Sequence, residues 1–198
     1  IHELLKLGVD IRIVSLKPAS EKMVQSDAAT LLDRVVYPPS AAVSLRRALG
    51  AIVSHPWRSL SEVWGLLRAL HRHPEALLKS VVVWWRTLAM LPDVIELAPR
   101  HLHAHWATYP STAAMIVAGR TGIPFSFTAH AHDIFLEDHL LAEKMRKAAF
   151  GVTISNFNRQ YLGERVSPLA HERMRIVHCG VSPRDYAFQP EGRQPGLV

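Results

Sequence analysis

The stretch Gly122-Ile-Pro-Phe-Ser-Phe-Thr-Ala-His-Ala-His-Asp-Ile-Phe135 decides the fold prediction for this 198-residue chain. A glycine suited to end a helix is followed by residues 124–128, which we predict to form a strand. Polar residues follow this strand directly, and in a parallel α/β sheet ligands gather at the carboxyl ends of the strands. The loop at 128–133 is therefore the predicted functional centre.

The segments on either side alternate between strand and helix patterns. Strands are predicted at 9–16, 34–37, 101–106, 124–128, 151–154 and 175–178, and helices at 1–8, 111–122, 136–150 and 156–165. A block at about 40–97 has apolar residues at helical spacing, with breaks predicted at His55-Pro56, His73-Pro74 and Leu91-Pro92. We predict an α/β fold: a Rossmann-like, mostly parallel sheet with helices on both faces and an extra helical block.

Composition restricts the classes of protein. A hydrophobic content of 48% and a charged content of 20% argue against disorder. The single cysteine, Cys179, excludes an intramolecular disulfide and suits a reducing, cytoplasmic location. A net charge of +6 favours anionic partners, but the basic residues are spread along the chain and form no Arg/Lys block typical of a nucleic-acid site, so we expect no nucleic acid. The longest apolar run, Val81–Trp85, is far shorter than the roughly 20 residues of a membrane span.

Histidines gather at the predicted carboxyl edge, and three interpretations are open. They are ordinary residues with satisfied hydrogen bonds, metal ligands, or contacts to a sugar or its phosphate. A binuclear metallohydrolase needs His-x-His-x-Asp-His, whereas this chain has His130-x-His132-Asp133-Ile134, and no Glu or His follows at ligand spacing. We therefore expect no metal.

Four segments resemble a known family. They are His-Leu-His-Ala-His-Trp-Ala-Thr at 101–108, the stretch at 122–135, Val-Thr-Ile-Ser-Asn-Phe-Asn-Arg-Gln-Tyr-Leu at 152–162 and Ile-Val-His-Cys-Gly-Val at 176–181. In this order they resemble the acceptor-side domain of retaining glycosyltransferases of family 4, the two-domain GT-B type, and most of all the bacterial exopolysaccharide and colanic-acid transferases. The resemblance covers about residues 99–190 and extends weakly to 1–17.

This resemblance implies a function and a set of site residues. The chain would transfer a sugar from a nucleotide-diphosphate donor to a glycan or lipid-linked acceptor, with retention, in cell-surface polysaccharide biosynthesis, and without a cofactor or metal. His130 would be the catalytic histidine that reaches the donor sugar, and Asp133 would brace its loop. The expected substrate-binding residues are His105, Thr128, His132, Asp133 and Ser155.

The resemblance also implies a domain division. Residues 1–182 would form the Rossmann-like acceptor-side domain, the amino-terminal half of a GT-B fold without its first strand. Residues 183–198 would be the interdomain linker and the start of the donor-binding domain. Since most of the donor site would lie outside this chain, we expect the chain alone to show no transfer.

Two questions stay open at this stage. The first concerns the helical block, where four tryptophans are interleaved with basic residues (Trp57, Trp64, Trp84, Trp85; Arg58, Arg68, Arg72, Lys79, Arg86). This pattern suits a surface that rests on the anionic inner face of the plasma membrane. It also suits an aromatic stripe that packs on the sheet while the basic residues face water. The alternatives to a glycosyltransferase are a non-catalytic ligand-binding α/β domain and a histidine-dependent metallohydrolase.

Overall fold

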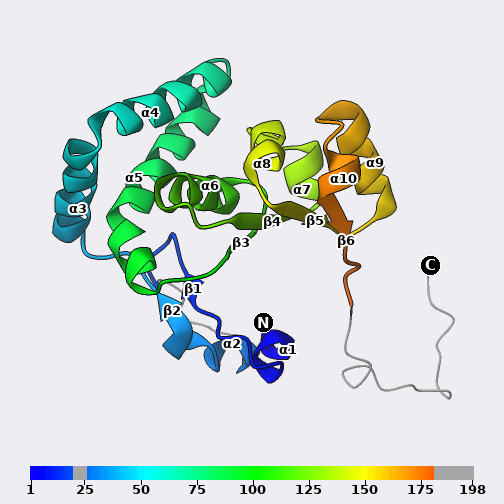
Figure 1. The fold of residues 1–198 in the computed structure, drawn as a ribbon, viewed down its shortest axis with the longest axis horizontal. Helices are drawn as coiled ribbons and strands as arrows, with labels where there is room; N and C mark the ends of the chain where they lie inside the picture. Colours follow the sequence, from blue (N-terminus) through cyan, green and yellow to red (C-terminus); the bar gives the residue numbers. More distant parts are fainter. Residues whose placement is uncertain (20–25, 181–198) are drawn as a thin grey trace, which may run out of the picture.

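The computed structural model describes residues 1–19 and 26–180, so the predicted linker at 183–198 lies outside the described residues. Figure 1 shows a four-stranded sheet with helices packed along it, and beside it an arc of three longer helices. The sheet part contains β3 (Leu102–His105), α6 (Tyr109–Thr121), β4 (Phe125–Ala129), α7 (Ala131–Phe135), α8 (Leu141–Lys147), β5 (Phe150–Thr153), α9 (Asn156–Arg165), α10 (Ala170–Arg173) and β6 (Met174–Ile176). The predicted Rossmann-like α/β class is confirmed.

The four strands are parallel and lie in the order β3-β4-β5-β6. A second, two-stranded parallel sheet is formed by β1 (Ile13–Val14) and β2 (Val35–Val36), near α1 (His2–Lys6), α2 (Ser26–Ala29) and the 3-10 turn η1 (Leu32–Arg34). The strand predicted at 9–16 is only two residues long in the structure, since β1 pairs with β2 at Ile13 and Val14 alone.

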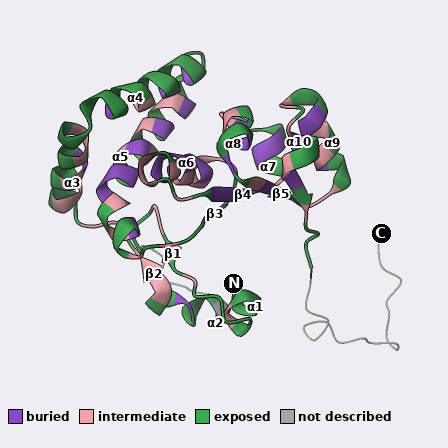
Figure 2. Ribbon diagram, viewed as in Figure 1, coloured by how far each residue is buried: buried purple, intermediate pink, exposed green. Residues whose placement is uncertain are grey.

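The two faces of the larger sheet differ in burial. Phe127, Ala129, Gly151 and Met174 lie on the buried face. Figure 2 shows buried stretches of β4 and β5 beside the helices of the sheet part. On the opposite face His103, His105 and Arg175 are exposed. Within the described residues the prediction of helices on both faces therefore holds for one face only. The pattern of β3 explains this, because its histidines alternate with apolar residues as in a half-exposed strand.

The centre of the sheet core is β4. Phe125 and Phe127 are almost fully buried, and each such side chain contributes about 1.5–3 kcal/mol to folding. Gly151 on β5 lies directly opposite Phe127. A Cβ at Gly151 would collide with the Met174 sulfur and come within 3.2 Å of the Phe127 ring. The glycine therefore lets the side chains of the two flanking strands, Phe127 of β4 and Met174 of β6, pack closely over β5.

Most helix bounds near the sheet follow the local sequence. The helix predicted to close at Gly122 does so, with that glycine at φ 78° and its N–H donating to the Ala118 carbonyl at 2.8 Å. The helix predicted at 156–165 is confirmed as α9. The short helices α7 and α10 were not predicted, because five and four residues are too few to show a helical period. The predicted loop at 128–133 is thus partly helical.

The arc consists of α3 (Ala41–Ser54), α4 (Pro56–Leu70) and α5 (Pro74–Glu96), as the sequence predicted for 40–97. Pro56 and Pro74 are the first residues of α4 and α5. At this position a helix needs no backbone N–H donor, so proline costs no hydrogen bond. The break predicted at Pro92 is wrong, since α5 continues through it to Glu96. Tertiary contacts hold the last turns: Val94 is buried, and Asp93 pairs with Arg47 of α3 at 2.7 Å.

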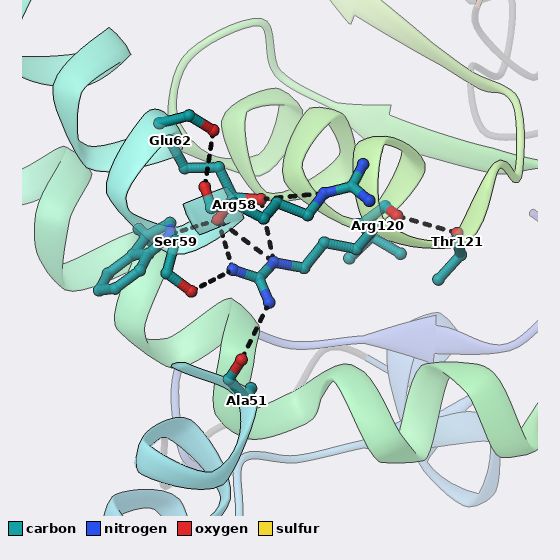
Figure 3. A network of polar contacts seen from close by, with 9 residues as sticks. Ala51, Arg58, Ser59, Glu62, Arg120 and Thr121 are labelled. Carbon is teal, nitrogen blue, oxygen red and sulfur yellow. Dashed lines mark hydrogen bonds and ion pairs between the residues drawn. The ribbon is translucent and has the colours of Figure 1, made fainter. Parts of the chain in front are cut away.

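A buried ion pair joins the arc to the sheet part (Figure 3). Arg120 of α6 donates to Glu62 of α4 through Nε at 2.9 Å and through Nη2 at 2.6 Å. Trp84 Nε1 donates to the same carboxylate at 2.7 Å, and Ser59 Oγ accepts from Arg120 Nη2 at 2.9 Å. The Arg120 side chain is only 4% exposed, so this cluster is a structural joint between the two parts.

Candidate functional site

The carboxyl ends of neighbouring strands bring several predicted site residues together. His105 ends β3 and lies beside Thr128 of β4. His130 comes directly after β4 and opens α7, and Asp133 follows one turn later. The geometry thus places four of the six predicted site residues at one edge of the sheet, where the topology of parallel sheets places ligands.

Asp133 connects the two loops at this edge. It is fully buried, and its Oδ2 accepts hydrogen bonds from the backbone N–H of Ala107 at 3.1 Å and of His130 at 3.0 Å. Its Oδ1 is buried and has no hydrogen-bond partner among the described residues. One carboxylate therefore braces the loop after β3 and the loop after β4 at once.

The His130 ring is held in one orientation by the start of α7. In this capping box the His130 side chain accepts from the backbone N–H of Asp133, while the Asp133 carboxylate accepts from the N–H of His130. The Nε2 atom is buried without a partner among the described residues, so the accepting atom is Nδ1. In the neutral imidazole the proton then lies on Nε2, which leaves an unused N–H donor.

Two further rings surround His130. The His105 ring is edge-on to it with centroids 5.1 Å apart, and the Trp106 indole lies 5.0 Å away. Trp106 has a φ of 89°, a conformation that is costly for a bulky residue and is often found at functional sites. The backbone N–H of Trp106 donates to the backbone carbonyl of Thr128 at 3.1 Å, and the Trp106 side chain stays 42% exposed. An exposed aromatic surface thus lies next to the unused donor.

A buried lysine supports the same edge from behind. Lys144 of α8 is 1% exposed, and its Nζ donates to the carbonyls of Ala107, Thr108 and His139 at 2.6, 2.7 and 3.2 Å. Burial lowers the pKa of Lys144 to about 7, while the nearby Asp133 acts in the opposite direction. The three carbonyl acceptors also favour the ammonium form. Lys144 therefore positions the backbone that follows β3.

Two other histidines, His103 of β3 and His101 directly before this strand, form hydrogen bonds with hydroxyl groups. His101 Nε2 and His103 Nδ1 meet the Ser126 Oγ at 2.7 and 2.8 Å, and His103 Nε2 meets the Thr128 Oγ1 at 3.0 Å. Burial lowers the pKa of His103, and its neighbours His101 and His105 lower it further. These contacts favour the interpretation of His101 and His103 as ordinary residues with satisfied hydrogen bonds.

His105 differs because its ring meets His130 rather than a hydroxyl group. Burial lowers the pKa of His105, His130 lowers it further, and Asp133 acts in the opposite direction. This lowered pKa favours the neutral imidazole of His105 over the charged form. It can therefore donate or accept a hydrogen bond at the rim of the site.

The last two predicted site residues have different surroundings. His132 is exposed on α7, and within 1–19 and 26–180 its side chain has no hydrogen bond or ring contact. Ser155 caps α9, where its Oγ accepts from the backbone N–H of Asn158 at 3.1 Å. The structure therefore leaves His132 apart from the ring cluster and gives Ser155 a helix-capping contact.

No set of three or more His, Cys, Asp or Glu side chains in the described part of the chain could hold a metal ion. The metallohydrolase alternative therefore has no ligand set among these residues, and Asp133 uses one of its oxygens for backbone N–H groups. Likewise, no described helix is long and apolar enough to cross a bilayer.

Searches against protein-family models, curated proteins and solved structures find no match to this chain.

Sequence reasoning missed two residues of this site. Trp106 directly follows β3, and this position at the carboxyl end of a strand could have marked it as a candidate site residue. The positive backbone φ of Trp106 could not be predicted from the sequence. Lys144 lies within the helix predicted at 136–150, and nothing in that stretch marks it as a site residue. Its burial has no local signal, since its acceptors Ala107 and Thr108 are more than 35 residues away.

Proposed function

We propose that this chain is the acceptor-side half of a retaining glycosyltransferase, which binds a nucleotide-diphosphate sugar and a glycan or lipid-linked acceptor at the His130 edge. One observation carries the proposal. The Nε2–H of His130 is oriented by a capping box, has no partner among the described residues, and lies at the carboxyl edge of a parallel sheet. Buried polar groups are normally hydrogen-bonded, so an oriented and unused donor at this place indicates a ligand.

The proposed role of His130 is that of a hydrogen-bond donor. Its Nε2–H would meet a hydroxyl of the donor sugar or an oxygen of the phosphate, where negative charge grows as the pyrophosphate leaves. A fixed donor of this kind typically accounts for about a hundredfold or more in rate. The exposed indole of Trp106 offers a flat apolar surface for the sugar ring. Asp133 and Lys144 keep the two loops in place through backbone groups.

Ligand binding tests this proposal with a matched pair of histidines. Saturation-transfer NMR would be recorded with UDP-, GDP- and dTDP-sugars on the wild type, His130→Gln and His132→Gln. His132 lies two residues away, is exposed and takes no part in the ring cluster. Because most of the donor site would lie outside this chain, we expect weak binding of at least one nucleotide sugar, which saturation transfer detects. His130→Gln should weaken this binding about tenfold through the lost hydrogen bond, and His132→Gln should leave it unchanged.

Two outcomes would overturn the proposal. The first is that none of the nucleotide sugars binds the wild-type chain. The second is that His130→Gln binds as well as the wild type, while circular dichroism shows that both are folded.

A further inference from the structure

The outer side of α4 carries an apolar surface that the fold does not use. Trp57, Leu60, Trp64 and Leu67 recur at intervals of three and four residues, so they lie on one face of the helix. We call these four residues the tryptophan face. Trp57 is 81% and Trp64 64% exposed, and Figure 2 shows α4 exposed along much of its length at the outer rim of the molecule. Large exposed apolar patches on soluble domains mark interaction sites.

The charges around this face are almost all positive. Arg68 follows Trp64 by one turn, and Arg72 continues the same row beyond the end of the helix. Neither side chain has a carboxylate partner among residues 1–19 and 26–180. Glu62 is the only acidic residue between Ser40 and His73, and it points inward to Arg120. The surface therefore presents tryptophans and uncompensated cations.

The neighbouring helix α3 extends this pattern. Leu45, Leu49 and Val53 are exposed at intervals of four residues, and α3 contains two arginines and no acidic residue. One of them, Arg47, is paired with Asp93, which leaves Arg46 exposed on the surface. Two consecutive helices thus combine an exposed apolar stripe with free positive charge.

We propose that the tryptophan face docks on an anionic phospholipid surface. Tryptophan is suited to the headgroup region because its ring is apolar and its N–H is polar. Arginine can place its stem along the apolar region while its guanidinium meets lipid phosphates. A second copy of this chain fits less well, since a symmetric contact would oppose Arg68 and Arg72 to the same cations of the partner. The inference does not depend on the proposed sugar transfer.

Vesicle co-sedimentation tests this proposal directly. The probes are phosphatidylcholine vesicles with and without phosphatidylglycerol. We expect binding only when phosphatidylglycerol is present, and weaker binding as the salt concentration rises. The double variant Trp57→Ser/Trp64→Ser should lose binding, and Arg68→Gln and Arg72→Gln should each weaken it about fivefold.

The control is another exposed aromatic side chain. Phe157 on α9 is 68% exposed and lies outside the arc, so Phe157→Ser should bind vesicles like the wild type. All the substituted side chains are exposed, and unchanged circular dichroism would confirm that the variants fold. Brominated lipids should quench the fluorescence of the wild type but not that of the double tryptophan variant.

Three results would overturn the proposal. The first is that the wild type does not sediment with phosphatidylglycerol vesicles. The second is that the double tryptophan variant binds these vesicles as strongly as the wild type. In the third, the wild type self-associates without vesicles, the double variant does not, and neither binds lipid; the partner would then be a second copy. Nucleotide-sugar binding is measured separately, so its failure would leave this result unaffected.

Discussion

Two buried charged clusters of this protein differ in how fully their polar atoms are used. In the joint between the arc and the sheet, both oxygens of Glu62 accept hydrogen bonds, from Arg120 and from Trp84 (Figure 3). At the carboxyl edge, Asp133 and Lys144 both bind the backbone of Ala107. There the Oδ1 of Asp133 and the Nε2 of His130 have no partner among the described residues.

The difference separates a structural cluster from a candidate site. A network whose members satisfy one another rigidifies the fold and has no capacity left for a ligand. A network that leaves an oriented donor unused loses stability, and this loss is offset only when something binds. The following substitutions test whether the Glu62–Arg120 cluster is structural and the Asp133 cluster serves a ligand site.

The largest effect is expected for Arg120→Ala. It leaves the mostly buried Glu62 carboxylate without its main partner, so the free energy of unfolding should fall by about 3–5 kcal/mol in urea denaturation. The double variant Glu62→Leu/Arg120→Leu removes both charges and should lose much less. If the single variant loses under about 1 kcal/mol, the cluster is not the structural joint that we describe.

A smaller loss is expected for Lys144→Met. Methionine keeps the apolar stem but leaves the carbonyls of Ala107, Thr108 and His139 without their donor, which should cost about 1–3 kcal/mol. Hydrogen exchange at the Trp106 amide should accelerate, because the loop after β3 is no longer held. Lys147→Met on the same helix is the control; its exposed pair with Glu143 should change stability by less than about 0.5 kcal/mol.

The same lysine predicts a pH dependence. Its pKa is about 7 in the folded protein and has an ordinary value of 10.5 in the unfolded chain, so unfolding takes up a proton between these values. The free energy of unfolding should therefore increase steadily as the pH is raised from about 7 to 10.5, by up to about 1.4 kcal/mol per pH unit. Lowering the pH through the same window should reverse this increase. Subtracting the curve of Lys144→Met isolates this contribution. Parallel curves for the two proteins would contradict the lowered pKa.

The smallest effect on stability is expected for Asp133→Asn. The amide oxygen can still accept from the N–H groups of Ala107 and His130, but without the charge, so the loss should be about 1 kcal/mol. Asp133→Ala leaves both N–H groups unpaired and should cost more. Nucleotide-sugar binding should weaken most in Asp133→Ala, in which the His130 loop loses its brace, and less in Asp133→Asn, in which both hydrogen bonds remain without the charge. Unchanged binding by Asp133→Ala would show that the brace is irrelevant to the site.

Much of the fold near the sheet was predictable because its signals are local. The helix that ends at Gly122, the helix at 156–165 and the strand before His130 each have their pattern within a few residues. The grouping of His105 and His130 also followed from the sequence, since consecutive parallel strands end at the same edge.

The sequence alone thus determined the α/β class, the parallel direction of the strands and the candidate edge, because the alternation of strand and helix patterns is visible in neighbouring residues. Tertiary structure alone decided that α5 runs through Pro92, that Lys144 is buried beneath the loop after β3, and that Glu62 pairs with Arg120. These features depend on contacts between residues far apart in the chain. The free energy of such contacts outweighs local preference, and no short window of sequence contains both partners.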